Sequence, residues 1–305
     1  MLTRQKIVIR LLGDGGGTQT KLELTKLCFL LAKEGRSEHL KTFYEFVPYK
    51  FGPYSFTLAH ELGNLAKDGL LVTQNETVEL TAKGKKVYRQ ALEARLARDI
   101  ELLWHNYSEL DQKELIDRVY KTYPWFTVNS QFSSKRKMQK SKADCANYTI
   151  GYQSFQVDGL LNKLLECGIG TLIDTRSNPV SRRYGFHKSS LSKLCSSVGI
   201  GYSHRPEVGI PSSWRQELET DAEYRKLFHR YEVEILPAQT EAVREIAWQM
   251  SDGPAALLCR ESEPAHCHRT ILANSLSKIN GLKIVDLLAP LAEDRLLIKF
   301  QTPLV

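Results

Sequence analysis

An acid and an arginine follow an apolar segment near the middle of the chain. Residues 171–173 have the composition of a buried strand, and Asp174 and Arg176 come directly after it. Open α/β sheets bind ligands beside the carboxyl ends of their strands, so we expect both side chains to project into a crevice. A carboxylate there can activate water or stabilise a developing cation, which makes both residues catalytic candidates. The alternative is a structural acid that caps the loop or pairs with Arg176.

More cations, an aromatic ring and an imidazole follow this acid. Arg182 and Arg183 carry planar guanidinium groups that suit phosphate or carboxylate, although one of the arginines in this stretch is expected to serve in a structural ion pair. Phe186, with Lys188 close behind, could stack on a base or lie buried under its own loop. His204 leaves the next strand and brings an imidazole to the same sheet edge, so it is a third catalytic candidate beside its structural alternative.

A second strand–loop–helix pattern near the C-terminus carries its own chemistry. Residues 255–259 are expected to form a buried strand, and Pro264 is expected to open a helix. His268 and Arg269 would then lie in the first turns of that helix, whose free backbone N–H groups attract anions. Cys259 could be a nucleophile, as in rhodaneses and cysteine phosphatases, but the loop lacks the glycine spacing of their cradle.

Cys259, Cys267 and His268 also raise the question of a metal ion. If the helix begins at Pro264, the adjacent Cys267 and His268 point about 100 degrees apart around it. Only one of them could then share a ligand set with Cys259. We therefore expect no metal and no other cofactor.

Composition and charge limit the classes of protein that fit. The 305 residues are enough for two domains, and 42% hydrophobic with 25% charged residues is typical of a globular protein. There is neither an apolar run long enough to cross a membrane nor a signal-peptide pattern, so we expect a cytoplasmic protein with no membrane partner. The net charge of +7 favours a polyanion such as DNA, or is incidental. The cysteines are expected to be reduced thiols.

The first part of the chain is expected to contain helices followed by a small hairpin. Ser55 can cap a helix that Gly69 ends, and two short strands follow over residues 70–73 and 77–80. Thr81 can cap a further helix running toward Leu103. Another amphipathic helix is expected over residues 109–123. Helices followed by a two-stranded wing describe a winged helix, which binds DNA or, alternatively, another protein or a second copy of the chain.

Two motifs add a resemblance to this N-terminal region. The run Tyr-Lys-Phe-Gly-Pro-Tyr-Ser over residues 49–55 and a Leu-x-x-Leu-x-x-x-Gly-Leu run ending at Leu70 resemble the Panacea/SocA-like antitoxin-associated domain, over about residues 5–90. The expected recognition helix carries only Lys67 as a strong cation, which weakens the case for DNA binding.

A basic segment separates the two halves of the chain. Lys135, Arg136 and Lys137 lie in it, and they would either be solvated or follow a phosphate backbone. We therefore expect a winged-helix-like domain with extra helices over residues 1–130, a basic linker over 131–146, and an α/β domain over 147–305.

From Tyr148 onward the pattern alternates between strands and helices. This alternation predicts a Rossmann-like α/β domain with a mostly parallel sheet, preceded by the α+β winged-helix-like domain. Several motifs in order resemble the domain-of-unknown-function 488 family over about residues 147–290. The motifs are Tyr-Thr-Ile-Gly-Tyr over 148–152, Ile-Asp-Thr-Arg over 173–176, Pro-x-Ser-Arg over 179–182, Gly-Phe over 185–186, Leu-Cys-x-Glu over 258–261, and Cys-His-Arg over 267–269. The resemblance implies a compact α/β fold with these motif residues at one sheet edge.

Together these features favour a nucleic-acid-directed hydrolase, most simply a DNA glycosylase-like enzyme that acts on an unusual base. In this hypothesis Asp174 orients water or stabilises the sugar cation, the arginines hold flanking phosphates, and Phe186 or Tyr184 stacks on a flipped base. One alternative is a winged-helix DNA-binding regulator whose C-terminal domain senses a nucleotide or another anion. Another is a sulfur- or phosphoryl-transfer enzyme that uses Cys259.

Overall fold

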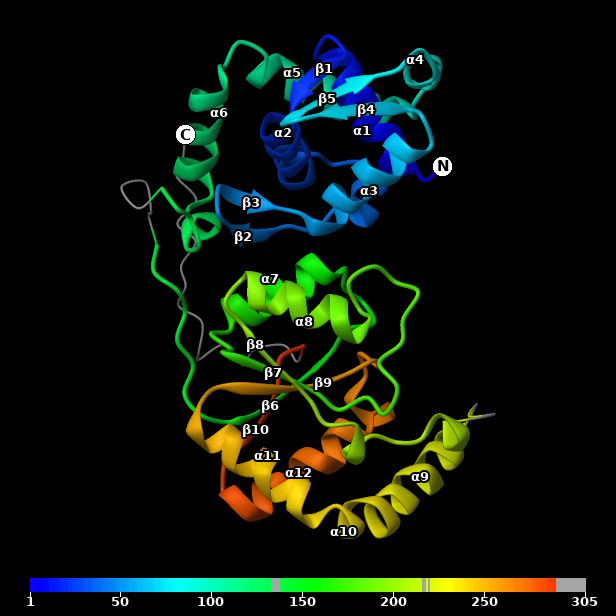
Figure 1. The fold of residues 1–305 in the computed structure, drawn as a ribbon, viewed down its shortest axis with the longest axis vertical. Coiled ribbons are helices and arrows are strands. Elements are labelled where there is room, and N and C mark those ends of the chain that lie inside the picture. Colours follow the sequence, from blue (N-terminus) through cyan, green and yellow to red (C-terminus); the bar gives the residue numbers. More distant parts are fainter. Residues whose placement is uncertain (133–137, 216–217, 219, 289–305) are drawn as a thin grey trace. The chain divides into compact units, whose positions relative to one another are not determined.

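The computed structural model describes residues 1–132, 138–215, 218 and 220–288 (Figure 1). The chain forms two compact units that are interleaved in sequence. Unit 1 comprises residues 1–142, 155–169 and 180–201, and unit 2 comprises residues 143–154, 170–179 and 202–305. Two segments that the sequence analysis placed in the α/β domain therefore belong to unit 1, and the domain boundaries expected near residues 130 and 147 stay a prediction.

Unit 1 begins with helices and a three-stranded antiparallel sheet in the order β1-β5-β4. The predicted helix after Ser55 is confirmed, because the Ser55 hydroxyl accepts the N–H of Leu58 and Gly69 follows the helix with a φ of 71°. The two predicted strands are confirmed as well. These elements are α1 (Thr3–Asp14), β1 (Thr18–Thr20), α2 (Lys21–Glu34), α3 (Phe56–Lys67), β4 (Leu71–Gln74) and β5 (Thr77–Leu80).

The helix predicted to run from Thr81 toward Leu103 is in fact two helices, α4 (Ala82–Tyr88) and α5 (Ala94–Tyr107). The prediction was wrong because the carboxylate of Glu93 accepts two backbone N–H groups and so starts a new helix. A third helix, α6 (Gln112–Thr122), starts with a capping box at Asp111.

Unit 1 also contains a short hairpin and two later helices: β2 (Val47–Tyr49), β3 (Gly52–Tyr54), α7 (Val157–Glu166) and α8 (Lys188–Ser197). Asp158 in the first turn of α7 is fully buried and joins this helix to the start of α3. Its carboxylate accepts the backbone N–H groups of Phe56 and Thr57 at 2.6 and 3.1 Å, and the Thr57 hydroxyl at 2.6 Å. A carboxylate at a helix N-terminus is stabilised by the free N–H groups there.

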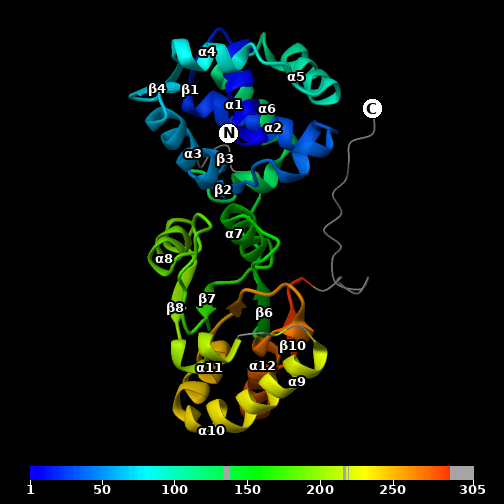
Figure 2. The same cartoon turned by 90° about the vertical axis from the view of Figure 1, so that its right-hand side faces the viewer.

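Unit 2 is built on a five-stranded sheet in the order β10-β6-β9-β7-β8, seen from a second direction in Figure 2. The strands are β6 (Asn147–Gly151), β7 (Thr171–Asp174), β8 (Gly201–His204), β9 (Ala255–Cys259) and β10 (Ile284–Asp286). The pairs β10–β6, β6–β9 and β7–β9 are all parallel, so the predicted Rossmann-like α/β architecture is confirmed.

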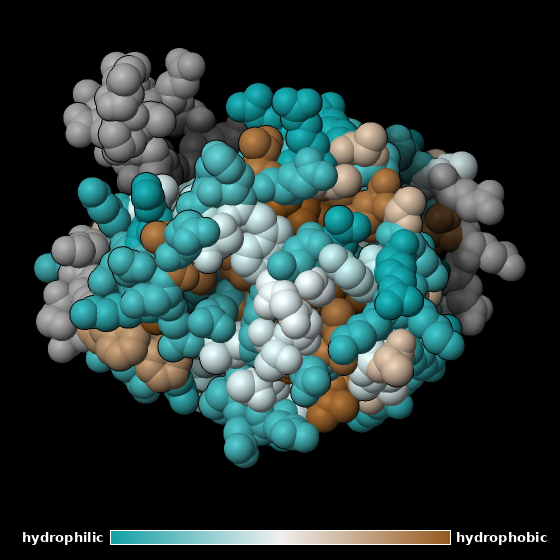
Figure 3. All heavy atoms as spheres, turned by 90° about the horizontal axis from the view of Figure 1, so that it is seen from above, coloured by the Kyte–Doolittle hydropathy of each residue, from teal (hydrophilic) through white to brown (hydrophobic). Residues whose placement is uncertain are grey.

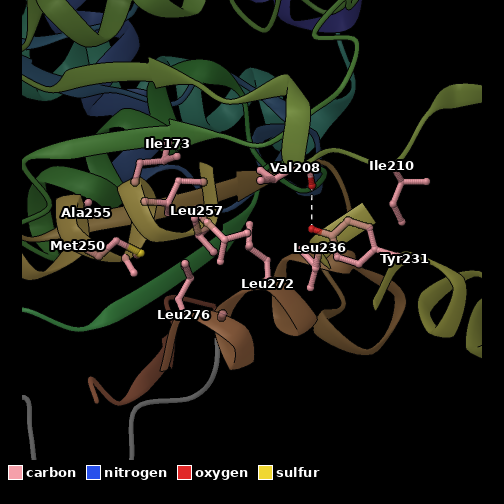
Figure 4. Packing of buried hydrophobic residues seen from close by; sticks show 14 of the residues in the cluster. Ile173, Val208, Ile210, Tyr231, Leu236, Met250, Ala255, Leu257, Leu272 and Leu276 are labelled. Atoms are coloured by element: carbon pink, nitrogen blue, oxygen red, sulfur yellow. Dashed lines mark hydrogen bonds between the residues drawn. The ribbon is translucent and has the colours of Figure 1, made fainter. Parts of the chain in front are cut away.

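Helices α11 (Thr240–Asp252) and α12 (His268–Asn280) pack against β9 and against each other. All five residues of β9 are buried, which explains why this strand is a continuous apolar run in the sequence. The core formed here contains Leu257 from the strand and Leu272 and Leu276 from α12 (Figure 4). Tyr231 joins it with its hydroxyl donating to the carbonyl of Val208 at 2.8 Å.

The surface gives two further observations. On the face drawn in Figure 3, hydrophilic residues predominate and hydrophobic residues form small separate areas. Among the described residues, no helix combines the length and the apolar composition that crossing a bilayer requires.

Candidate functional site

The carboxyl ends of three neighbouring strands form one edge of the unit 2 sheet. β7 and β9 pair with Asp174 opposite Leu258, and β6 and β9 pair with Gly151 opposite Cys259. From β6 the chain continues to β7 on one side of this pair, whereas from β9 it continues to β10 on the other side. The end of the β6–β9 pair is therefore a topological switch point, where open α/β sheets bind their ligands.

Asp174, Arg176 and Tyr202 form what we call the β7-end cluster. Asp174 is fully buried and accepts the Arg176 Nε–H at 2.8 Å, the Arg176 backbone N–H at 3.1 Å and the Tyr202 hydroxyl at 2.6 Å. A second guanidinium nitrogen of Arg176 lies 2.5 Å from the other carboxylate oxygen. Both oxygens of Asp174 are thus engaged by groups of the protein.

The electrostatics of the β7-end cluster follow from this pairing. Burial lowers the pKa of the Arg176 guanidinium, but the hydrogen bond and charge of Asp174 outweigh burial and raise it overall. Burial and the Asp174 carboxylate both raise the pKa of the Tyr202 hydroxyl. At neutral pH Arg176 is therefore a cation and the Tyr202 phenol is protonated.

Arg176 links this ion pair to two further side chains. Its Nη1 donates to the Tyr152 hydroxyl at 3.2 Å, and the guanidinium lies 5.1 Å from the Tyr152 ring centroid. His204 Nε2 lies 2.9 Å from the backbone oxygen of Arg176. The structure thus brings together the three predicted catalytic residues Asp174, Arg176 and His204, with Asp174 orienting the arginine.

Cys259, Cys267 and His268 form a second group, the β9-end cluster. All three are buried, with exposed fractions of 1%, 1% and 0%, and their potential ligand atoms all lie within 4.8 Å of one another. Cys259 Sγ is 3.5 Å from His268 Nδ1. The other ring nitrogen, Nε2, lies 3.4 Å from the Thr175 hydroxyl. This set of two thiols and an imidazole could hold a metal ion.

The expectation that Cys267 and His268 diverge around a helix was wrong. Pro264 opens only a short 3-10 turn, Pro264–His266, and α12 begins at His268. Cys267 precedes the helix in an extended conformation, with φ −136° and ψ 133°. The 100-degree rotation between successive residues of a helix therefore does not separate Cys267 from His268, and both side chains lie close to Cys259.

Polar groups surround the thiols. The Cys267 S–H and the imidazole of His268 lower the pKa of the Cys259 thiol well below its usual value, against the effect of burial. Glu261 Oε2 lies 3.1 Å from Cys259 Sγ, and Arg215 donates to Glu261 at 2.9 Å. Arg215 Nη2 also lies 3.1 Å from His268 Nδ1. The site therefore combines soft ligands with a carboxylate and a cation.

Arg269, predicted to bind phosphate, is fully buried and bonded to protein oxygens. Its guanidinium donates to the backbone oxygens of Glu261 and Ser262, and it pairs with Asp286 at 3.1 Å. These contacts fasten the loop after β9 to the end of β10.

The sequence around both clusters also matches a family. Residues 156–276 match the family model described as Domain of unknown function DUF488. The match confirms the predicted resemblance for this part of the chain. No curated protein and no solved structure matches the chain. The resemblance of the N-terminal region to the Panacea/SocA-like domain stays a prediction.

Four predicted nucleic-acid contacts in the DUF488 region lie in unit 1. Phe186 is 1% exposed, which agrees with the alternative of a ring buried under its loop. Arg183 lies 4.8 Å from that ring centroid and donates to the backbone oxygen of Phe155. Arg182 and Lys188 are exposed. Their role in nucleic-acid binding stays a prediction. Lys135, Arg136 and Lys137 lie outside the described residues.

The candidates taken from the sequence did not include Tyr202, Tyr152 or Arg215, each of which takes part in one of the two clusters or supports it. Tyr202 lies two residues before His204 on β8, so strand alternation places both on one face of the sheet and could have suggested it. Tyr152 directly follows β6 at the same edge. Arg215 gives no signal, because it lies 46 positions before the Glu261 to which it donates.

Proposed function

We propose that unit 2 is a hydrolase that acts on nucleic acid, with its reactive centre at the carboxyl edge of the sheet. The observation that carries the proposal is the set of groups at the ends of β7 and β9: a partly exposed carboxylate, Glu261, that pairs with the guanidinium group of Arg215, and the ion pair of Arg176 with Asp174 at the end of the neighbouring strand. Acid–base groups next to fixed cations suit the hydrolysis of an anionic substrate. The net charge of +7 supports a polyanion.

The roles within the site differ from those expected at first. Because both oxygens of Asp174 are engaged, we assign it to holding Arg176 in place, with Arg176 as an anchor for the substrate. Glu261 takes the role of the carboxylate that handles water, since its side chain is 20% exposed and points toward the switch point through its contact with Cys259. The bond we expect to break is the N-glycosidic bond of an unusual base.

A direct experiment is to incubate the full chain with DNA that carries normal or modified bases and to search by mass spectrometry for released bases and new strand ends. We expect release from at least one modified substrate. Glu261→Gln should lose it while keeping DNA binding, because the amide cannot accept a proton. The exposed Glu263→Gln is the matched control and should retain wild-type activity.

Two results would count against the hydrolase. One is the absence of any released base or strand end from every substrate. The other is equal activity of Glu261→Gln and wild type. Binding of DNA that responds to a small nucleotide, with no covalent change, would favour a regulator instead.

A second candidate is a transfer enzyme with Cys259 as its nucleophile. The 3.5 Å separation of Cys259 Sγ from His268 Nδ1 favours it, because a nearby imidazole is the usual activator of a cysteine. Retained activity of Cys259→Ser would remove this candidate.

A further inference from the structure

We propose that Cys259, Cys267 and His268 bind a thiophilic divalent cation of the zinc class. The proposal concerns a site for a cation, which the hydrolase proposal does not require. It depends on the placement of the three side chains in unit 2, and four features support it.

The first feature is the spacing of the ligand atoms. Zinc–sulfur and zinc–nitrogen bonds of about 2.3 and about 2.0–2.1 Å, joined at a tetrahedral angle, place the two ligand atoms roughly 3.5–3.6 Å apart. Cys259 Sγ and His268 Nδ1 are 3.5 Å apart. The ligand atoms of the whole trio lie within 4.8 Å of one another. A cation could therefore enter with only small side-chain adjustments.

The second feature is the chemistry of the ligands. Two thiolates and an imidazole are soft donors that select zinc and similar transition metals over magnesium or calcium, which prefer oxygen. Two thiolates would also neutralise a divalent cation. Because all three side chains are at most 1% exposed, water would reach the ion only from the side of the fourth ligand.

The third feature is how the backbone holds the ligands. Cys259 ends a fully buried strand, whereas His268 begins α12 and Cys267 precedes it in an extended conformation. The imidazole is fixed from behind, since Nε2 lies 3.4 Å from the Thr175 hydroxyl, which itself donates to the carbonyl of Leu258. Such outer contacts leave Nδ1 directed at the thiols, as in known metal sites.

The fourth feature is the pair of charged groups at the remaining side. Glu261 Oε2 is 3.1 Å from Cys259 Sγ, so a carboxylate lies next to the fourth position. Arg215 Nη2, 3.1 Å from His268 Nδ1, would have to release that nitrogen to the cation. The arginine is 31% exposed and keeps its second contact with Glu261, so this release requires only a side-chain rotation.

The test is to strip the full chain with a chelator, add cobalt(II) under reducing conditions and record the absorption spectrum. We expect one cobalt per chain, thiolate-to-cobalt charge-transfer bands, tetrahedral d–d bands, and loss of these bands when zinc is added. Zinc should also raise the melting temperature of the stripped protein. Elemental analysis of protein purified without added metal gives an independent count.

Variants assign the signal to its ligands. Cys259→Ser and Cys267→Ser should each lose the tetrahedral spectrum, whereas the matched control Cys167→Ser, a partly exposed cysteine outside the trio, should keep it. If a serine variant does not fold, Cys267→His tests the same position, because it should restore binding with weaker charge-transfer bands. Wild type without stoichiometric cobalt, or cobalt bands that survive in Cys259→Ser and Cys267→Ser, would overturn the proposal.

The outcomes also separate this site from the hydrolase. Glu261→Gln should keep the thiolate-to-cobalt charge-transfer bands, since it removes no thiolate, but it should no longer release a base. Wild type that binds cobalt but releases no base would leave the metal site standing and remove the hydrolase. Wild type that releases bases but binds no cobalt would do the opposite.

Discussion

The ends of β7 and β9 are neighbours in one sheet, yet their buried polar groups are satisfied in different ways. At the end of β7, Asp174 has a cation and a phenol as partners, and each contact joins an N–H or O–H donor to oxygen. At the end of β9, two thiols and an imidazole face one another, and sulfur is a weak partner in a hydrogen bond. The first cluster is complete within the protein, whereas the second can gain a strong partner.

This difference separates a structural role from a functional one. A buried charge needs a partner in the folded protein. An acid at a strand end that pairs with a nearby arginine is therefore engaged within the protein and not free to act on a substrate. A group of ligands whose mutual contacts are weak loses little when a cation enters. In our proposals the most conspicuous acid in the sequence therefore supports the site, while Glu261 handles water and the less conspicuous cysteine pair binds a cation.

The variant with the largest expected effect disrupts the β7-end cluster. Asp174→Ala should lower the free energy of unfolding by about 3–5 kcal/mol, because Arg176 is left buried without its counter-charge. Urea unfolding of the full chain measures this loss. Asp252→Ala, which removes an exposed carboxylate at the end of α11, is the control and should change stability by no more than about 0.5 kcal/mol.

The same variant also tests whether the two clusters are independent. Under conditions where Asp174→Ala stays folded, it should bind cobalt as wild type does, because no ligand of the β9-end cluster has changed. Equal stability of Asp174→Ala and Asp252→Ala would show that the ion pair is not the structural element that we describe.

The pH dependence of stability tests Asp158, a buried carboxylate that has no arginine among its hydrogen-bond donors in the described part of the chain. Burial raises the pKa of Asp158 to about 6, although the surrounding Thr57, Phe56 and Ser55 donors lower it in part. Since the folded pKa exceeds the unfolded value near 4, the folded state binds more protons between these values. Stability should therefore fall as pH rises from about 4 to about 6, by on the order of 3 kcal/mol for this group.

Unfolding free energies of wild type and Asp158→Asn across this range measure the effect. The curve of the variant should lack the downward contribution, so the difference between the two curves should change with pH and level off above about 7. The exposed Asp68→Asn should follow wild type. Parallel curves for wild type and Asp158→Asn would show that Asp158 carries no raised pKa.

The fold was predictable where burial leaves a clear pattern. Residues 255–259 form the expected strand because a strand covered on both faces must be apolar throughout. Helix α9 (Asp221–Arg230) was not predicted, although Tyr224, Leu227 and Phe228 recur at helical spacing in its sequence. β10 was not predicted because a strand of three residues is too short to show an alternating pattern.

The site was predictable in part for a comparable reason. Asp174 and His204 could be placed at one edge because strand ends in a parallel sheet share an edge. That both oxygens of Asp174 are hydrogen-bonded could not be predicted, since one of the donors is Tyr202, which approaches only through a tertiary contact. The grouping of both Cys267 and His268 with Cys259 was missed because a 3-10 turn, which the sequence does not reveal, delays the start of the helix.

The variant with the smallest expected effect tests whether Asp174 carries a charge in the β7-end cluster. Tyr202→Phe removes one donor, 2.6 Å from Asp174, and leaves the ion pair intact, so we expect a loss of about 1.5–2 kcal/mol in the free energy of unfolding. Tyr231→Phe is the matched control, because that hydroxyl donates to the neutral carbonyl of Val208 at 2.8 Å and should cost about 1 kcal/mol. A bond to a carboxylate must be worth more than a bond to a carbonyl if Asp174 is ionised in the folded protein. Equal losses in urea unfolding of the two variants would therefore mean that Asp174 is not a buried anion, and the contrast between the two strand ends would fail at its charged half.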